Sequence, residues 1–126
     1  MEKIFHFLRK TNNKIYNVTV KTFEDGNKYV IDGKRQKKIT INKNNIDTLK
    51  LQISNQNYQN HPLRFSTNKD GIHNNGNEYT NAIIIDTDDK NTIITINLKN
   101  APKRLYYYCI KHPVMGSFIN FSSYGY

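Results

Sequence analysis

The sequence of 126 residues contains one cysteine and no long hydrophobic run. A single cysteine cannot form a disulfide within the chain, so the fold does not depend on an oxidising compartment. No segment approaches the roughly 20 apolar residues of a transmembrane helix. Residues 1–10 are too short in apolar length for a signal peptide, and no small-residue cleavage site follows them. These absences predict a soluble, cytoplasmic protein without a transmembrane segment, periplasmic only if a leader has been removed.

Acidic residues are also scarce, since 10 Asp and Glu face 19 Lys and Arg and give a formal net charge of +9. Such a balance favours acidic partners, including acidic protein and nucleic-acid surfaces. Only residues 34–38 form a dense basic run, however, and there is no RNA-binding aromatic signature or zinc-finger spacing. We therefore expect a solvated basic face rather than a dedicated nucleic-acid site.

Helical periodicity of useful length is missing as well. The apolar residues are mainly isoleucine and tyrosine, which favour strands, and they alternate with polar residues at a period of two. Strands are expected over residues 15–23, 28–31, 38–41, 49–53, 61–66, 82–85, 91–98, 105–109 and 117–122. Loops are expected over 54–60 and 67–81. Frequent turns between about eight short strands predict an all-β antiparallel sandwich or barrel. The domain would span 15–126, after an N-terminal arm or edge strand at 1–14.

What the sequence does contain is a concentration of metal-binding side chains in residues 106–116. Cys109, His112 and Met115 lie within seven consecutive positions. Thiolate, imidazole and thioether are the ligand set of a soft transition-metal site, particularly a copper centre. A second imidazole is available upstream in His61, and strand alternation directs both His61 and Cys109 inward at strand ends. The alternative is a buried Cys109 that acts as a small hydrophobic residue, with His112 and Met115 as incidental loop residues.

This order of ligands resembles that of the cupredoxin (blue copper) family, and the loop spacing is similar to that of amicyanin. A tyrosine-rich strand also enters Cys109, a proline follows His112, and a glycine follows Met115. The resemblance covers roughly residues 15–122 and implies a Greek-key β-sandwich. It implies that His61, Cys109 and His112 bind one copper ion in a trigonal plane, with Met115 as a long axial ligand. The implied function is single-electron transfer without enzymatic activity, because four protein ligands leave no open position for a substrate.

The resemblance also carries expectations about partners. A redox partner would dock at His112, where Pro62, Pro113 and Val114 form an apolar rim. Further segments look like small cupredoxin modules of marine microbes and their viruses, some of which are parts of larger structural or virion proteins: residues 61–67, 70–71, 78–80, 101–102 and 105–109. The alternative function is therefore a virion-associated or surface-assembly module on a cupredoxin scaffold, with copper structural or absent.

One position departs from the family pattern. In most cupredoxins the residue after the first histidine donates its main-chain N–H to the copper-bound sulfur. Here that residue is Pro62, which has no N–H. The sulfur would keep more electron density and favour Cu(II), so we expect a reduction potential lower than that of a Pro62→Asn variant.

The remaining candidate residues are weaker. His73 lies in the long loop. Its alternatives are a ligand of a second metal ion or a contact with the rim of the copper site, but a solvated side chain is expected. His6 has no partner that the sequence identifies. Asp86, Asp88 and Asp89 resemble a fragment of a calcium loop but lack its glycine and terminal glutamate, so a turn is expected.

Overall fold

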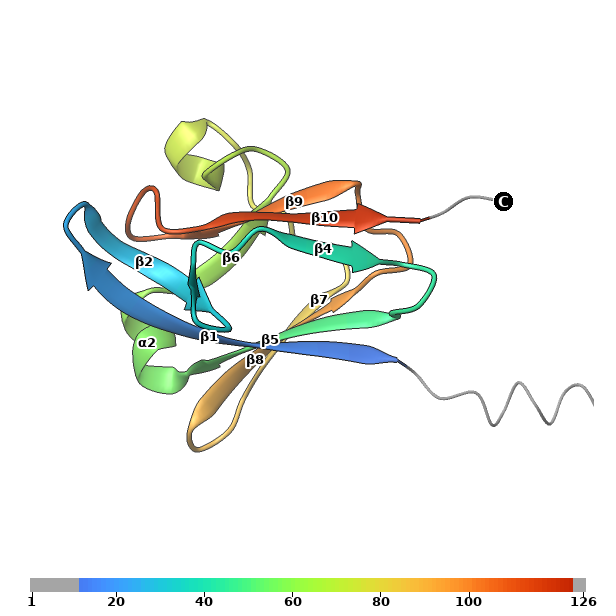
Figure 1. Cartoon of the computed structure of the whole chain (residues 1–126), viewed down its shortest axis with the longest axis horizontal. Coiled ribbons are helices and arrows are strands. Elements are labelled where there is room, and N and C mark those ends of the chain that lie inside the picture. The colour runs from blue at the N-terminus through green and yellow to red at the C-terminus, as the bar shows by residue number, and fades with distance from the viewer. Residues whose placement is uncertain (1–11, 124–126) are drawn as a thin grey trace, which may run out of the picture.

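The computed structural model describes residues 12–123, and within them it is almost entirely β-structure (Figure 1). The strands are β1 (Asn13–Phe23), β2 (Gly26–Ile31), β3 (Lys34–Arg35), β4 (Ile39–Asn42), β5 (Thr48–Ser54), β6 (Leu63–Ser66), β7 (Ile83–Thr87), β8 (Asn91–Asn97), β9 (Arg104–Cys109) and β10 (Ser117–Ser122). The helices are α2 (Asn55–Asn60) and the short 3-10 helix η1 (Gly71–Asn74). The all-β prediction is confirmed, although ten strands are present where about eight were expected. No helix of the described part is long and apolar enough to cross a membrane.

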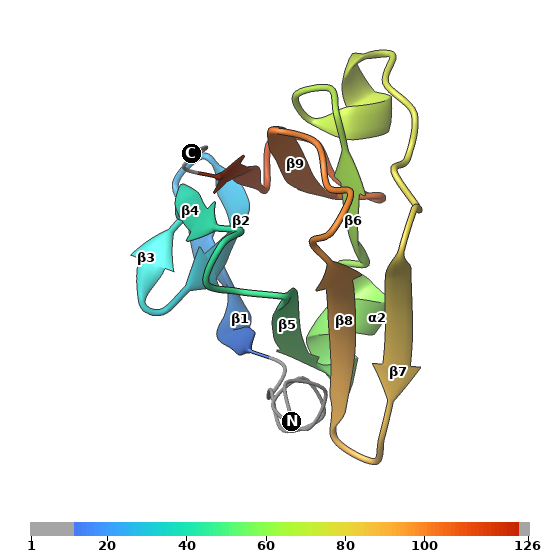
Figure 2. The ribbon, with the colours of Figure 1, turned by 90° about the vertical axis from the view of Figure 1, so that its right-hand side faces the viewer.

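The strands form two sheets. One has the order β3-β2-β1-β5-β8-β7 and the other the order β4-β10-β9-β6. Figure 2 shows β1, β5, β8 and β7 side by side in the larger sheet. The pairs β1–β5 and β4–β10 are parallel, and the other pairs are antiparallel. The expectation of a purely antiparallel arrangement was therefore wrong. Parallel neighbours need a crossover connection, and period-two alternation carries no information about strand direction.

The core lies between the sheets and is built from alternate residues of each strand. In β5, Leu49, Leu51 and Ile53 are buried, whereas the intervening residues are half-buried. In β9, Leu105, Tyr107 and Cys109 share the buried face that the alternation predicts. Cys109 is therefore the last residue of a core strand, with its side chain on the buried face.

Residues 54–60 differ from the expected loop. The chain forms α2 there, and the Ser54 side-chain oxygen caps the helix by accepting a hydrogen bond from the Asn57 N–H at 3.2 Å. A serine before a helix is a recognised start signal, but five polar residues and Tyr58 provide no apolar periodicity to reveal the helix. His61 is consequently the C-cap residue of α2, and β6 begins only at Leu63.

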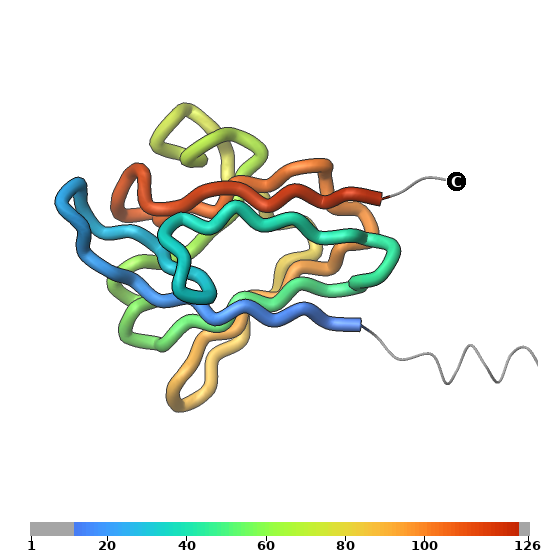
Figure 3. Tube along the Cα trace, viewed as in Figure 1, coloured from blue at the N-terminus to red at the C-terminus, as the bar shows by residue number. Residues whose placement is uncertain are grey.

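The terminal and loop predictions have mixed outcomes. Residues 1–11, which include His6, lie outside the described residues. Residues 13 and 14 of the expected arm belong to β1 and pair with β5. Residues 67–81 are irregular apart from η1. Figure 3 shows that the β1–β2 turn, α2 and the β9–β10 connection gather at one end of the molecule.

Candidate metal centre

His61 is held in place by the end of α2. Its N–H donates to the Asn57 carbonyl at 2.7 Å, and its own carbonyl accepts a hydrogen bond from the Tyr29 hydroxyl at 2.7 Å. The next residue, Pro62, accepts a hydrogen bond from the Ile110 N–H at 3.1 Å. Two segments far apart in sequence are thus joined directly beside the imidazole.

The β9–β10 connection, residues 110–116, carries His112 and Met115, and we call it the ligand loop. Cys109 is the last residue of β9 and directly precedes it. Cys109 ends β9 opposite Leu63 of β6 and is 0% exposed. His112 is exposed in the turn that follows. Met115 is 1% exposed and belongs to the same hydrophobic core as Cys109.

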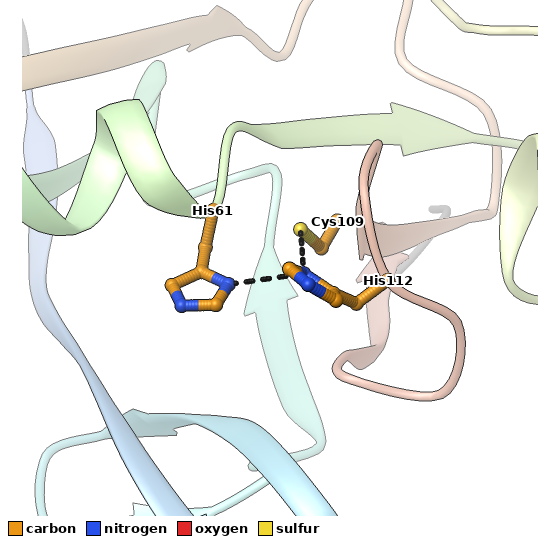
Figure 4. A group of neighbouring side chains, drawn as sticks. All are labelled: His61, Cys109 and His112. Carbon is orange, nitrogen blue, oxygen red and sulfur yellow. Dashed lines mark hydrogen bonds between the residues drawn. The ribbon is translucent and has the colours of Figure 1, made fainter.

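Three donor atoms converge at this end of the sandwich (Figure 4). His61 Nδ1 and His112 Nδ1 are 3.2 Å apart, and Cys109 Sγ is 3.7 Å from His112 Nδ1. The ligand atoms of all three residues lie within 4.8 Å of one another. Ligand atoms 2.0–2.3 Å from one ion and at 120° to one another are about 3.5–4.0 Å apart, so the separations of 3.2 and 3.7 Å are close to those needed around a single metal ion.

The electrostatics of the cluster favour a neutral imidazole. Burial lowers the pKa of His61, and the positive charges of His112 and Lys111 lower it further. A neutral imidazole has a free lone pair for a metal ion. The cluster contains no carboxylate, and its imidazole and thiol donors suit zinc or copper rather than calcium or magnesium.

The ligand loop is anchored from the side of β2 and β3. The Lys28 ammonium, almost fully buried, donates to the Val114 carbonyl at 2.7 Å. The Gln36 side-chain amide donates to the carbonyls of Val114 and Gly116, at 3.2 and 3.0 Å. Val114 has a φ of +58°, which is unfavourable for a β-branched residue. These contacts therefore hold a strained backbone in place.

The long loop anchors the ligand loop from the other side. Both carboxylate oxygens of Asp70 accept from the Val114 N–H at 3.1 Å. His73 Nε2 donates to the Cys109 carbonyl at 2.7 Å, and its ring packs edge-on against Tyr108. His73 is exposed, as expected of a loop histidine, but these two contacts also fix its ring. His73 is not in the donor cluster, but it contacts the main chain of the candidate cysteine ligand.

The sequence-predicted site is thus largely assembled. His61, Cys109 and His112 are brought together, whereas the role of Met115 as fourth ligand stays a prediction. Asp88 forms the expected turn, because its carboxylate accepts from the N–H groups of Lys90 and Asn91. The expectation was wrong for Asp86, which belongs to β7 and pairs with Ile93 of β8. Sequence reasoning missed the residues that anchor the ligand loop, Lys28, Gln36 and Asp70, and no local pattern marks them.

Comparisons with known proteins do not extend this description: no protein-family model, no curated protein and no solved structure matches the chain. The candidate centre is therefore argued from its own residues.

Proposed function

We propose that this protein is a mononuclear copper protein that transfers single electrons. The observation that carries the proposal is the convergence of His61 Nδ1, Cys109 Sγ and His112 Nδ1 within 4.8 Å. Two imidazoles and one thiolate in a trigonal arrangement are typical of copper electron-transfer sites. A bound copper ion would supply the change between Cu(I) and Cu(II).

The surrounding residues would keep the donor positions the same in both oxidation states. The Val114 peptide, in the middle of the ligand loop, is held on both sides, by Lys28 at its carbonyl and by Asp70 at its N–H. The Cys109 carbonyl is held by His73. Such anchoring limits how far the ligands move when the charge of the ion changes, which favours rapid electron transfer. It also argues against a copper ion whose main role is to order the loop.

Met115 would complete the site. It follows His112 by three residues and is buried with Cys109 in the core, so its thioether is the nearest further soft donor in the sequence. With Met115 as a fourth protein ligand no position would be left for a substrate, which favours electron transfer over catalysis.

The partner would be a redox protein that docks at the exposed edge of the site. His112 is exposed, and it is followed by the exposed residues Pro113 and Val114, the latter 59% exposed. Half-buried Pro62 lies beside His61. Because His112 bears a donor atom and also reaches solvent, it is the shortest route from the ion to a partner. The surplus of basic residues would favour an acidic partner surface.

Titration with Cu(II) in the visible range tests this proposal. A bound thiolate should give an intense charge-transfer band at about 600 nm, as expected of a site with one cysteine and two histidine ligands. His61→Ala and Cys109→Ser should each abolish the normal spectrum. His73→Ala is the matched histidine control, because His73 contacts the site only through the main chain of Cys109, and it should retain the band. A colourless adduct of the unaltered protein, or no binding, would refute the proposal.

A further inference from the structure

Tyr29 contacts both segments that carry the candidate ligands. It lies in β2 and is 0% exposed. Its hydroxyl donates to the carbonyl of His61 at 2.7 Å, and its main-chain N–H donates to the carbonyl of Met115 at 3.0 Å. A single residue of the larger sheet therefore joins the segment of the first histidine to the end of the ligand loop.

Tyr29 and Cys109 belong to the same hydrophobic core. Burial raises the pKa of Tyr29 well above its usual value, and the neighbouring Cys109 side chain raises it further. The hydroxyl proton of Tyr29 is directed at the carbonyl oxygen of His61.

We propose that Tyr29 is the positioning residue of the metal centre, whose hydroxyl sets the place of the His61 imidazole relative to Cys109. This inference rests on the proposed function. The main chain of His61 and Pro62 is held by three hydrogen bonds, from α2, from the ligand loop and from Tyr29. The first two join main-chain groups, so the hydrogen bond from the Tyr29 hydroxyl is the one of the three that a side-chain substitution can remove.

The chain offers a matched control in Tyr107. Its side chain is 1% exposed, and its hydroxyl donates to the Lys37 carbonyl at 2.7 Å. The rings of Tyr29 and Tyr107 are neighbours, with centroids 6.2 Å apart. Tyr29→Phe and Tyr107→Phe therefore delete the same group, with the same kind of acceptor, from the same part of the core. Only Tyr29→Phe removes a hydrogen bond to a candidate metal-ligand residue.

The experiment compares Cu(I) affinity, by competition titration with a chromophoric chelator, in the unaltered protein and the two variants. Residues that orient metal ligands typically change affinity by 10- to 100-fold when altered. We expect Tyr29→Phe to weaken Cu(I) binding about tenfold or more. It should also shift the charge-transfer band and the electron paramagnetic resonance spectrum of the Cu(II) form. Tyr107→Phe should change neither, although urea unfolding should show a similar loss of stability in both variants.

The outcomes separate the two proposals. Absence of a charge-transfer band in the unaltered protein refutes the proposed function. A normal band there, with equal affinities and spectra in the two variants, overturns the role of Tyr29 and leaves the proposed function standing. Should Tyr29→Phe not fold, carbon-13 spectra of the unaltered protein decide the question. On Cu(I) loading the ring Cζ signal of Tyr29 should shift more than that of Tyr107, and an equal or smaller shift overturns the inference.

Discussion

Gly116 marks the place where the ligand loop passes closest to β9, and Gly116→Ala tests how tightly the site is built. A Cβ added there would lie 1.8 Å from the carbonyl oxygen of Tyr107, whereas contacts of real Cβ atoms are essentially never below 3.0 Å. The two backbones would have to separate by the difference, about 1.2 Å, and both sides of the contact are main chain rather than flexible side chains. Ser117, the next residue, pairs directly with Tyr107, so the shift disrupts the first residue pair between β9 and β10.

The expected cost follows from what that shift disrupts. Breaking one or two ladder hydrogen bonds costs about 1 kcal/mol each, and overpacking of a close contact adds about 1–3 kcal/mol. We therefore expect Gly116→Ala to reduce the free energy of unfolding by about 2–5 kcal/mol, measured by urea denaturation. Cys109 on β9 and Met115 before β10 both lie between the disturbed contact and the turn of the ligand loop. Cu(I) affinity should consequently fall at least tenfold, as for other residues that orient ligands.

Gly33→Ala is the control for the added methyl group. Gly33 also has a constrained backbone, with a φ of +77°, but a Cβ there meets nothing within 4 Å. It should cost about 1–2 kcal/mol, the usual penalty of a left-handed conformation, and leave metal binding unchanged. If Gly116→Ala proves no more destabilising than Gly33→Ala, the close approach of the ligand loop to β9 is wrong.

Two further substitutions test separate parts of the argument. The Tyr108 hydroxyl is buried and has no hydrogen-bond partner among the described residues, so Tyr108→Phe should leave stability unchanged or raise it by up to about 1 kcal/mol in urea unfolding. A loss larger than about 1 kcal/mol would show that the hydroxyl has a partner. Pro62→Asn restores a main-chain N–H beside His61 and should raise the reduction potential of the copper form in voltammetry. An unchanged or lower potential would contradict the argument from the missing donor.

Much of the candidate site was predictable because its signals are local. Alternation at a period of two directed Cys109 inward, and the structure places it at the inner end of β9. His112 lies three residues beyond Cys109, so any tight turn after the strand returns its imidazole toward the sulfur. For His61 the donor role was predicted, but the expected position at the end of a strand was wrong, because His61 is the C-cap residue of α2 and β6 begins at Leu63. Tyr58 is the only apolar side chain among the six residues of that helix, so no apolar pattern predicted it.

The residues that anchor the site were not predictable, because their partners are distant in sequence. Lys28 and Val114 are 86 positions apart, and Asp70 and Val114 are 44 apart. Composition assigns a lysine or an aspartate of this kind to a solvated surface, since charged residues are rarely buried unless paired. Strand order decides which of them reach the ligand loop. The two parallel strand pairs show that alternation alone does not determine that order.

The distribution of these anchors bears on what a metal ion would do here. Tyr29 of β2 holds both His61 and the carbonyl of Met115, while Asp70 and His73 of the long loop hold Val114 and Cys109. None of these contacts involves a metal-donor atom of His61, Cys109 or His112, so the cluster is arranged by the fold itself. An ion entering such a cluster would meet donors already near their final separation. Such an ion would add its redox chemistry without having to order the ligand loop. This is the physical reason for favouring electron transfer over a copper ion that only stiffens a structural module.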